Sequence, residues 1–473
     1  RQRQMCIRDS PNTTITTMPK KSHVELSGTA FSQYGKLHEA SAMYEGLRTN
    51  IPVDLMSYRD FPFKRGNGLF LERFEILDYL KRFGNYIGLN ENIRYNTRVV
   101  DIKRISTGPS VWLVTSVNGK EEHHEQFDRV ILANGMCSVP RIPNVPGLEH
   151  FRGTQVHSAW YRTPTVFRNK RVLIVGNFSS GTDIAREICG GSVRNFAGGD
   201  QWQRDVEAGA TNTKVFQSYL RLDLPPPLDY DPRDASSPDW CRRIQVVGKI
   251  NHVAQDGALQ LTDGSRLNVD TIVWATGFWR SMPFLNQNNP PFDENPLIPF
   301  PGTPFTCPPN ENVNVFGNKD VSGTTTLTNM DDWQIFYKPD PTMAIIGAPI
   351  HNIPFPFMQV QARAVASYWA NLIPKLPQLS PNLSSLNPER WTTHKEHEPL
   401  GNIVASNHSV ETPSEEAYID ALVELLPGDD GKTRPPWDHD LYSRGPEGWH
   451  KIPTWRRDRM QNRIALRRAE LGY

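Results

Sequence analysis

The chain has 473 residues, enough for about three domains at roughly 150 residues each. Its 52 Lys and Arg residues nearly balance 51 Asp and Glu residues, and a net charge of +1 argues against a nucleic-acid-binding surface or an acidic tail. Hydrophobic residues make up 38 %, which is enough for a buried core, and the 39 prolines predict long irregular connections.

Residues 1–18 have no feature of a folded domain. They lack the apolar run of about 7–15 residues that marks a secretory signal. We interpret them as a non-domain leader, either a sequence-assembly remnant ahead of Met18 or a disordered tail. No run in the chain approaches the ~18 apolar residues of a membrane span. Five cysteines without a Cys-x-x-Cys pair indicate reduced thiols and a cytoplasmic location.

A weak internal repeat organises the middle of the chain. Each copy is expected to hold two hairpin strands and then a short apolar strand between an aspartate and a glycine seven positions apart. The hairpin strands are 98–105 and 110–117 in the first copy and 244–250 and 258–261 in the second, and the apolar strands lie between Asp128 and Gly135 and between Asp270 and Gly277. Short, fully apolar strands are typical of a parallel sheet covered by helices, so an α/β fold is predicted.

A strand–turn–helix pattern precedes the second copy and resembles the opening of a dinucleotide-binding βαβ unit. Its spacing is Gly-x-x-x-x-Gly, because Phe178 occupies the middle glycine position. Gly176 permits a tight turn, and Gly181 lets the helix pack on the strand. Ser179 and Ser180 offer N–H groups to a pyrophosphate. The alternative is a turn that needs small residues only for packing.

No equivalent pattern is found upstream of residue 98. Gly28, Gly35, Gly46, Gly66 and Gly68 do not follow an apolar strand. We therefore expect the first unit to be truncated at its N-terminus.

The region after Gly277 begins with an irregular Pro- and Asn-rich connection at 286–314. Helices are predicted at 356–372 and at 413–426, where Thr412 caps the second helix and Glu415 closes a capping box. A third, basic helix is predicted at 455–473. It can pack against the rest of the protein or, as the alternative, touch a membrane surface.

Two histidine-containing segments are not expected to bind metal. Residues 121–125 (Glu-Glu-His-His-Glu) are predicted to form a charged turn, and His394 and His397 have no third ligand nearby in sequence.

One segment carries a more specific signal: Phe151, Gly153, His157 and Tyr161 fit the pattern Phe-x-Gly-x-x-x-His-x-x-x-Tyr/Phe. This resembles the identifying motif of the flavin-containing monooxygenases and the related Baeyer–Villiger enzymes. Further stretches resemble the same family in order along the chain: 44–52, 60–63, 138–147, 275–278 and 361–363. The fungal-type soluble branch is the nearest likeness.

The resemblance implies two dinucleotide-binding (Rossmann-like) domains, with the NADPH domain inserted into the FAD domain. The expected boundaries are 1–18 for the leader, 19–165 for an incomplete N-terminal part of the FAD domain, 166–285 for the NADPH domain, 286–385 for the return to the FAD domain and 386–473 for a C-terminal helical extension. The family's N-terminal FAD-binding glycine motif is missing from this sequence.

The resemblance also implies the chemistry. NADPH passes a hydride to FAD, reduced flavin adds O₂, and the C4a-hydroperoxyflavin oxygenates a soft nitrogen or sulfur of a small amine or sulfide. Neither nucleic acid nor a membrane span is expected, and the oligomeric state is left open. The alternatives are an inactive NADPH-binding fragment that does not retain FAD, and a Baeyer–Villiger-type monooxygenase. A thioredoxin-reductase-like enzyme would need a Cys-x-x-Cys pair.

Site residues follow from the matched motifs. Asn50 is expected beside flavin C4a, with a turn residue as the alternative. Gln361 is expected near the isoalloxazine, with an exposed helix position as the alternative. Arg194 is expected at the NADPH 2′-phosphate, with an unrelated surface arginine as the alternative. The remaining expected residues are Gly176, Ser179, Ser180 and Gly181 at the NADPH pyrophosphate, Thr276 and Gly277 at the cofactor, and His157 and Tyr161 as braces of the linker between domains.

Overall fold

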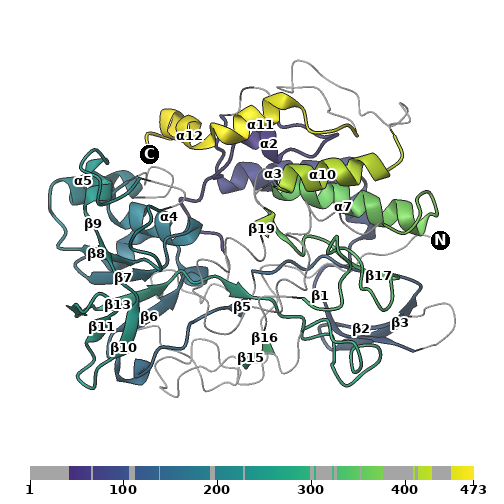
Figure 1. Cartoon of the computed structure of the whole chain (residues 1–473), viewed down its shortest axis with the longest axis horizontal. Coiled ribbons are helices and arrows are strands. Elements are labelled where there is room, and N and C mark those ends of the chain that lie inside the picture. Colours follow the sequence, from purple (N-terminus) through teal and green to yellow (C-terminus); the bar gives the residue numbers. More distant parts are fainter. Residues whose placement is uncertain are drawn as a thin grey trace.

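The computed structural model describes residues 42–64, 66, 68–105, 112–137, 139–191, 198–226, 230–298, 303–304, 322–323, 327–351, 353–376, 409–410, 414–428 and 449–473. Figure 1 shows two lobes joined near strand β5, with helices α11 and α12 running along both. The first lobe contains strands β6 to β13 and helices α4 to α6. The second lobe contains β1 to β4, β17 and helices α2, α3, α7 and α10.

The first lobe is built on a five-stranded parallel sheet. Its order is β6 (Thr154–His157), β13 (Thr271–Trp274), β7 (Arg171–Val175), β8 (Lys214–Ser218) and β9 (Ile244–Val247). Its helices are α4 (Ser179–Ile188), α5 (Gly199–Glu207) and α6 (Asp239–Arg242). The chain winds outward through β7, β8 and β9 and returns through β13 on the other side of β7. The predicted α/β fold is confirmed, and a topological switch point lies between β7 and β13.

The second copy of the repeat is divided differently from the prediction. The predicted strand 244–250 is two strands, because β9 belongs to the parallel sheet and β10 (Ile250–Val253) begins an antiparallel meander with β11 (Leu259–Leu261) and β12 (Arg266–Leu267). Gly248 separates them: its N–H donates to the Asp263 carboxylate at 2.9 Å, and a Cβ there would lie 2.9 Å from the Thr262 hydroxyl oxygen. The close approach to this turn takes the chain out of the sheet.

The second lobe contains the first copy. Strands β1 (Thr97–Arg104), β2 (Trp112–Asn118) and β3 (Glu121–Phe127) form an antiparallel meander, and β4 (Val130–Leu132) pairs in parallel with β17 (Met343–Ile345). The predicted charged turn at 121–125 is wrong. These residues form most of β3, an edge strand whose side chains alternate between exposed and half-buried, so polar residues are tolerated there.

The two lobes are joined by two paired connections. Strand β5 (Val139–Pro140) leads into the first lobe, and β14 (Phe278–Trp279) leads back, and the two pair antiparallel. Arg141 N donates to the Gly277 carbonyl at 2.9 Å and extends this pairing. The first lobe is therefore inserted into the second through a double linker. Strand β6, which the expected boundary at 165 assigns to the FAD domain, lies in the sheet of the first lobe.

The helices after the linker differ in detail from their predictions. Helix α7 (Pro354–Trp369) starts two residues earlier than predicted, because Pro354 suits the first turn, and it ends before Asn371, whose φ is 57°. Helix α10 spans Ser414–Leu425, and Thr412 lies outside the described residues. The carboxylate of Glu415 accepts from Ile353 N at 2.9 Å.

The predicted basic helix at 455–473 is two helices, α11 (Thr454–Gln461) and α12 (Arg463–Leu471), which meet at Asn462. Arg456 and Arg467 are buried. The structure therefore supports packing against the protein over a membrane-facing role for this segment.

The remaining elements are the 14-residue helix α3 and several short ones. They are α2 (Val53–Met56), α3 (Arg73–Tyr86), η1 (Leu89–Asn92), η2 (Leu148–His150), η3 (Ser158–Trp160), η4 (Pro164–Phe167), β15 (Thr303–Pro304), β16 (Ser322–Gly323), β18 (Ile350–His351) and β19 (Ser409–Val410). Among the described residues, no helix is long and apolar enough to cross a membrane. The same part of the chain holds no group of three or more His, Cys, Asp or Glu side chains suited to a metal ion. The leader 1–18, His394 and His397 lie outside it.

Candidate functional site

The switch point brings the turn after β7 against the end of β13. Ala275 N donates to the Val175 carbonyl at 3.0 Å. Gly176, the next residue, has a φ of +115°, and a Cβ there would lie 2.6 Å from the Ala275 carbonyl oxygen. Both the backbone conformation and the contact therefore require glycine.

Gly181 brings the first turn of α4 onto the same backbone. A Cβ at this position would lie 2.1 Å from the Gly176 carbonyl oxygen, so no larger residue fits without moving the helix. Phe178, at the middle position of the motif, has an extended backbone (φ −94°, ψ −169°) and a side chain that is 47 % exposed. The turn therefore tolerates a large residue there.

The N-terminus of α4 opens at this turn. Phe178 is the N-cap and supplies no side-chain cap, so Ser179 and Ser180 begin the helix without one. The N–H groups of a helix's first turn carry partial positive charge and suit an anion such as a pyrophosphate. Neighbouring groups hold the turn in place: the Thr182 hydroxyl donates to the Asn177 carbonyl at 3.1 Å.

Helix α4 is buried on its outer face as well as against the sheet. The Tyr44 hydroxyl donates to Asp183 at 2.5 Å, and the Tyr161 hydroxyl donates to Glu187 at 2.5 Å. Burial raises the pKa of Glu187 to about 8, against the opposing effects of the Tyr161 hydrogen bond and Arg186. Burial also acts to raise the pKa of Asp183, but nearby arginines and the Tyr44 hydroxyl hold it below its usual value.

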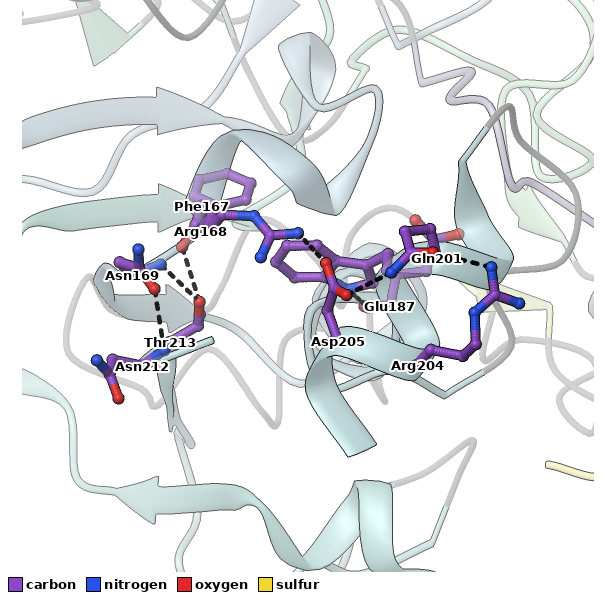
Figure 2. Close-up of polar contacts among 10 residues, drawn as sticks. Phe167, Arg168, Asn169, Glu187, Gln201, Arg204, Asp205, Asn212 and Thr213 are labelled. Carbon is purple, nitrogen blue, oxygen red and sulfur yellow. Dashed lines mark hydrogen bonds and ion pairs between the residues drawn. The ribbon is translucent and has the colours of Figure 1, made fainter. Parts of the chain in front are cut away.

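The segment between α4 and β8 is held at several points, as Figure 2 shows. Arg168 pairs with Asp205 of α5, and Gln201 donates to the same carboxylate at 2.6 Å. The Thr213 hydroxyl donates to the Phe167 carbonyl at 3.1 Å, just before β8 begins. These bonds fix the start of β8 beside β7.

The structure explains why each of these residues of the identifying motif is needed at its position. Phe151 is 3 % exposed and packs in the core under the sheet. A Cβ on Gly153 would lie 2.5 Å from the Asp270 carbonyl oxygen and 2.5 Å from the Phe151 ring. Tyr161 reaches α4 through Glu187. The motif thus fits β6 tightly against the start of β13 and connects it to α4.

His157 lies at the base of the double linker. Its Nδ1 accepts from Ala159 N at 3.1 Å, so Nε2 carries the proton and donates to the Gly277 carbonyl at 2.9 Å. Burial lowers the pKa of His157 to about 3. The imidazole is therefore neutral at physiological pH and joins β6 to the returning linker.

Thr276 and Gly277 use their polar atoms within the linker. The Thr276 hydroxyl donates to the Arg141 carbonyl, and the Thr276 carbonyl accepts from Arg141 Nε at 3.1 Å. Gly277 accepts from both Arg141 N and His157. These contacts join the two connections between the lobes.

Gln361 is fully buried in α7, so the alternative of an exposed helix position is wrong. Its Oε1 accepts from Gly347 N at 2.9 Å, and its Nε2 donates to the Tyr418 hydroxyl at 2.8 Å. Both polar atoms of the side chain therefore connect the end of β17 to α10.

Asn50 is exposed, in a bend of a stretch that runs beside residues 69–73. Thr49 N donates to Leu71 O at 3.0 Å, and Val53 N donates to Leu69 O at 2.8 Å. Gly46 packs on α4, where a Cβ would lie 2.3 Å from a Glu187 carboxylate oxygen. Four residues span at most ~14 Å, so the backbone of Asn50 lies within about this distance of Gly46.

Arg194 lies outside the described residues. Arg221, which is not among the residues expected from the sequence, follows the end of β8 by three residues. The end of the second strand of a Rossmann unit is where the ribose 2′ position is recognised. The sequence signal for Arg221 is its position just after the second strand of the unit. Glycine spacing alone does not indicate this position.

Comparison with known proteins agrees with this geometry. The family model described as Flavin-binding monooxygenase-like matches residues 30–200. The Arabidopsis thaliana flavin-containing monooxygenase FMO GS-OX-like 9 is 30 % identical over 342 residues, which cover 70 % of this chain and 62 % of that protein. FMO GS-OX5 from the same plant is 32 % identical over 257 residues, or 52 % of this chain and 49 % of the relative. The chain spans about half the length of the curated relatives it matches.

Solved structures share the fold. S-allyl-L-cysteine S-oxygenase from Allium sativum has a TM-score of 0.60 at 22 % identity, covering 91 % of this chain and 80 % of that one. Tmm from a Pelagibacter strain has a TM-score of 0.53 at 16 % identity, covering 82 % and 74 %. The family match includes the β7–α4 turn and the identifying motif, and the chain therefore belongs to the flavin-containing monooxygenase family.

Proposed function

We propose that this protein is an FAD- and NADPH-dependent monooxygenase that oxygenates a soft nitrogen or sulfur atom of a small amine or sulfide. The observation that carries the proposal is the contact of Gly176, Gly181 and Ala275 at the switch point, in front of the open N-terminus of α4. This is the arrangement that brings the backbone close to a dinucleotide pyrophosphate.

NADPH is assigned to the first lobe. The N–H groups of Ser179 and Ser180 would hold its pyrophosphate, because α4 has no side-chain cap. Arg221 would bind the 2′-phosphate from the end of β8. Its guanidinium already adopts a two-nitrogen contact with the Asp223 carboxylate at 2.8 and 2.6 Å, and the same geometry suits a phosphate.

FAD is assigned to the second lobe. The family uses FAD together with NADPH. Strands β4 and β17 run in parallel, so their carboxyl ends share one edge, as those of β7 and β13 do. Gly135, three residues beyond β4, has a φ of +72° and open space around a Cβ, which suits a ligand near the backbone. Bound flavin would supply the hydride-accepting and O₂-activating chemistry.

The protein's own residues would position the two cofactors. Asn50 would offer its exposed amide to the reacting edge of the flavin. The β5–β14 linker and its bond from His157 to Gly277 would hold the two lobes at a fixed separation. Exclusion of water between the lobes would then protect the oxygenating species.

Cofactor loading tests the proposal directly. Purified protein should show a flavin absorption band near ~450 nm that NADPH bleaches in the absence of oxygen. With oxygen restored, NADPH consumption should match formation of an amine N-oxide or a sulfoxide. A ketone converted to an ester would instead indicate a Baeyer–Villiger enzyme. A protein that binds neither flavin nor NADPH would contradict the proposal.

Nucleotide preference tests the role of Arg221. Arg221→Ala should raise the dissociation constant for NADPH about 10-fold or more and leave that for NADH nearly unchanged, because hydrogen bonds to charged groups contribute roughly 1.5–3 kcal/mol. Arg242→Ala is the matched control, since Arg242 is an exposed arginine of the same lobe that pairs with Asp239 on α6. Equal effects of the two substitutions would remove Arg221 from the site.

A second candidate is NADPH binding without oxygenation. It is favoured by the connection from β17 to α7, which contains the strand β18 and one glycine, Gly347, rather than a glycine-rich turn. A colourless protein that still binds NADPH would establish this second function.

A further inference from the structure

Helices α11 and α12 together contact both lobes. Figure 1 shows α11 above α2 and α12 above α4. We call residues 454–473 the α11–α12 segment. Its arginines, which gave the sequence its basic character, face partners in separate parts of the chain.

The α11 helix is attached to the second lobe. Arg459 pairs with Asp54 of α2 at 3.1 Å, and Arg456 donates to the Leu55 carbonyl at the end of the same helix. Met460 is fully buried in the core formed by α2, α3 and the start of α7. Arg457 pairs with Asp420 of α10 at 2.7 Å. Charge and apolar contacts thus fix one end of the segment.

The α12 helix is attached to the first lobe. Arg467 pairs with Asp183 of α4 at 3.3 Å. The Tyr473 ring lies 4.2 Å from the Arg186 guanidinium and 5.2 Å from that of Arg467. Arg468 lies over the Tyr230 ring at 3.7 Å. Asp183, Arg186 and Tyr230 belong to the inserted lobe. Glu470 of the same helix accepts from Leu69 N of the second lobe at 2.9 Å, so α12 contacts both lobes.

These contacts cover a helix face that would otherwise be open. Every residue of α4 from Gly181 to Ile188 is buried, including Asp183, Arg186 and Glu187. A helix on one face of a parallel sheet ordinarily exposes its outer side to water. Here the outer side of α4 is closed by Tyr44, Tyr161 and α12.

A double linker alone leaves an inserted lobe free to rotate about the linker. The β5–β14 pair is two residues long on each strand. The stretch that carries Tyr44 also reaches α4 from the second lobe. The α11–α12 segment adds a further attachment, made at the helix whose N-terminus opens on the switch point. Rotation of the first lobe would have to break the Arg467–Asp183 pair and the contacts of Tyr473.

We propose that the α11–α12 segment is an interlobe clamp that fixes the direction of α4, and that Arg467 and Tyr473 are positioning residues for the nucleotide site. The clamp itself rests on the contacts above. Its effect on NADPH rests on the function proposed for the first lobe.

Amide hydrogen exchange tests the clamp without any cofactor. Arg467→Met keeps an unbranched side chain but removes the guanidinium group that faces Asp183. Tyr473→Leu removes the ring and leaves the ion pair. Both variants should speed exchange in residues 181–188 and at β5 and β14 by about tenfold, while α3 exchanges as in the parent. Arg463→Met is the matched control, because Arg463 lies on α12 and donates to the Met460 carbonyl of the adjoining helix.

Nucleotide binding tests the consequence. The dissociation constant for NADPH, followed by nucleotide fluorescence, should rise about tenfold in Arg467→Met and Tyr473→Leu, within the range by which remote contacts modulate a site. A double-mutant cycle with Asp183→Asn should give a non-additive effect for Arg467 and an additive one for Arg463.

The outcomes separate the two hypotheses. If the parent protein does not bind NADPH, the proposed function fails, and hydrogen exchange still decides the clamp. If α4 exchanges equally in Arg467→Met, Tyr473→Leu and Arg463→Met, the clamp is overturned, whatever the protein binds. Should Arg467→Met not fold, Tyr473→Leu carries the same test.

Discussion

Strands β13 and β4 have the same sequence pattern but different burial. Each is a short apolar strand between an aspartate and a glycine seven positions apart. All four residues of β13 are buried, whereas Ile131 of β4 is 46 % exposed. The difference follows from neighbours: β13 lies between β6 and β7, while β4 pairs with β17 alone among the described residues. The local sequence thus predicts that each segment is a strand, but the burial of the strand depends on neighbouring strands that are distant in sequence.

The glycines in the turns of the two lobes also differ in how closely other residues surround them. In the first lobe, Gly176 and Gly181 have backbone oxygens where a Cβ would be, and in the second lobe Gly135 has open space. Gly181 is therefore required by contact, Gly176 by both contact and backbone conformation, and Gly135 by backbone conformation alone.

Gly181→Ala should have the largest effect. Its Cβ would lie 2.1 Å from the Gly176 carbonyl oxygen, so α4 must move away from the turn. We expect a loss of stability of about 3 kcal/mol, at the upper end for overpacking, and loss of measurable NADPH binding. Thermal unfolding and nucleotide titration measure the two effects.

Gly135→Ala is the control from the other lobe. Its positive φ costs about 1 kcal/mol for a non-glycine residue, without any collision. NADPH binding should stay as in the parent. Similar losses in both variants would contradict the contrast between the two turns.

Val273→Ala and Ile131→Ala compare the two strands at the same position of the repeat. Val273 is fully buried, so removing two methyl groups should cost about 2 kcal/mol, counting transfer and cavity terms. Ile131 is half exposed, and the larger truncation should cost less than about 1 kcal/mol. Denaturant unfolding, monitored separately for each lobe, measures the two losses of stability. A larger cost at Ile131 would show that a partner covers β4.

The sequence was sufficient for the elements in which several local signals coincide. The β7–α4 unit combines an apolar strand, two glycines and a helix, and these signals stand within one short stretch of sequence, although Gly176 also meets the distant Ala275. The strand β3 was missed because an edge strand needs no apolar alternation, and the break at Gly248 was missed because it depends on Asp263 in a later turn.

The buried hydrogen-bond and ion-pair network around α4 could not be predicted from the sequence for a different reason. Tyr44 and Asp183 are 139 positions apart, and Asp183 and Arg467 are 284 apart. No periodicity links such residues, and each reads in isolation as an ordinary surface polar side chain. The same holds for Gln361, whose two partners, Gly347 and Tyr418, lie on different elements.

The pH dependence of the two lobes offers a further comparison, because each lobe contains a carboxyl group whose pKa is raised by burial. Burial raises the pKa of Glu187 to about 8 in the first lobe and that of Asp331 to about 7 in the second, where Ile335 N and Phe336 N donate to it at 2.7 and 3.0 Å. Each folded carboxyl then holds a proton that the unfolded chain releases. The stability each contributes is full below its unfolded pKa and declines until pH reaches the folded value.

Glu187→Gln mimics the protonated form and should remove the decline between about pH 4.5 and 8. Relative to the parent, it should gain at least about 1 kcal/mol between pH 5 and pH 8.5, since one pKa unit corresponds to about 1.4 kcal/mol. Melting temperatures at the two pH values measure this gain as a few degrees. Asp331→Asn should act in the same direction, with its range ending one unit lower, near pH 7. If the gap between Glu187→Gln and the parent is the same at both pH values, Glu187 is already ionised at pH 5, and the Tyr161 hydroxyl and Arg186 outweigh the burial of its carboxylate.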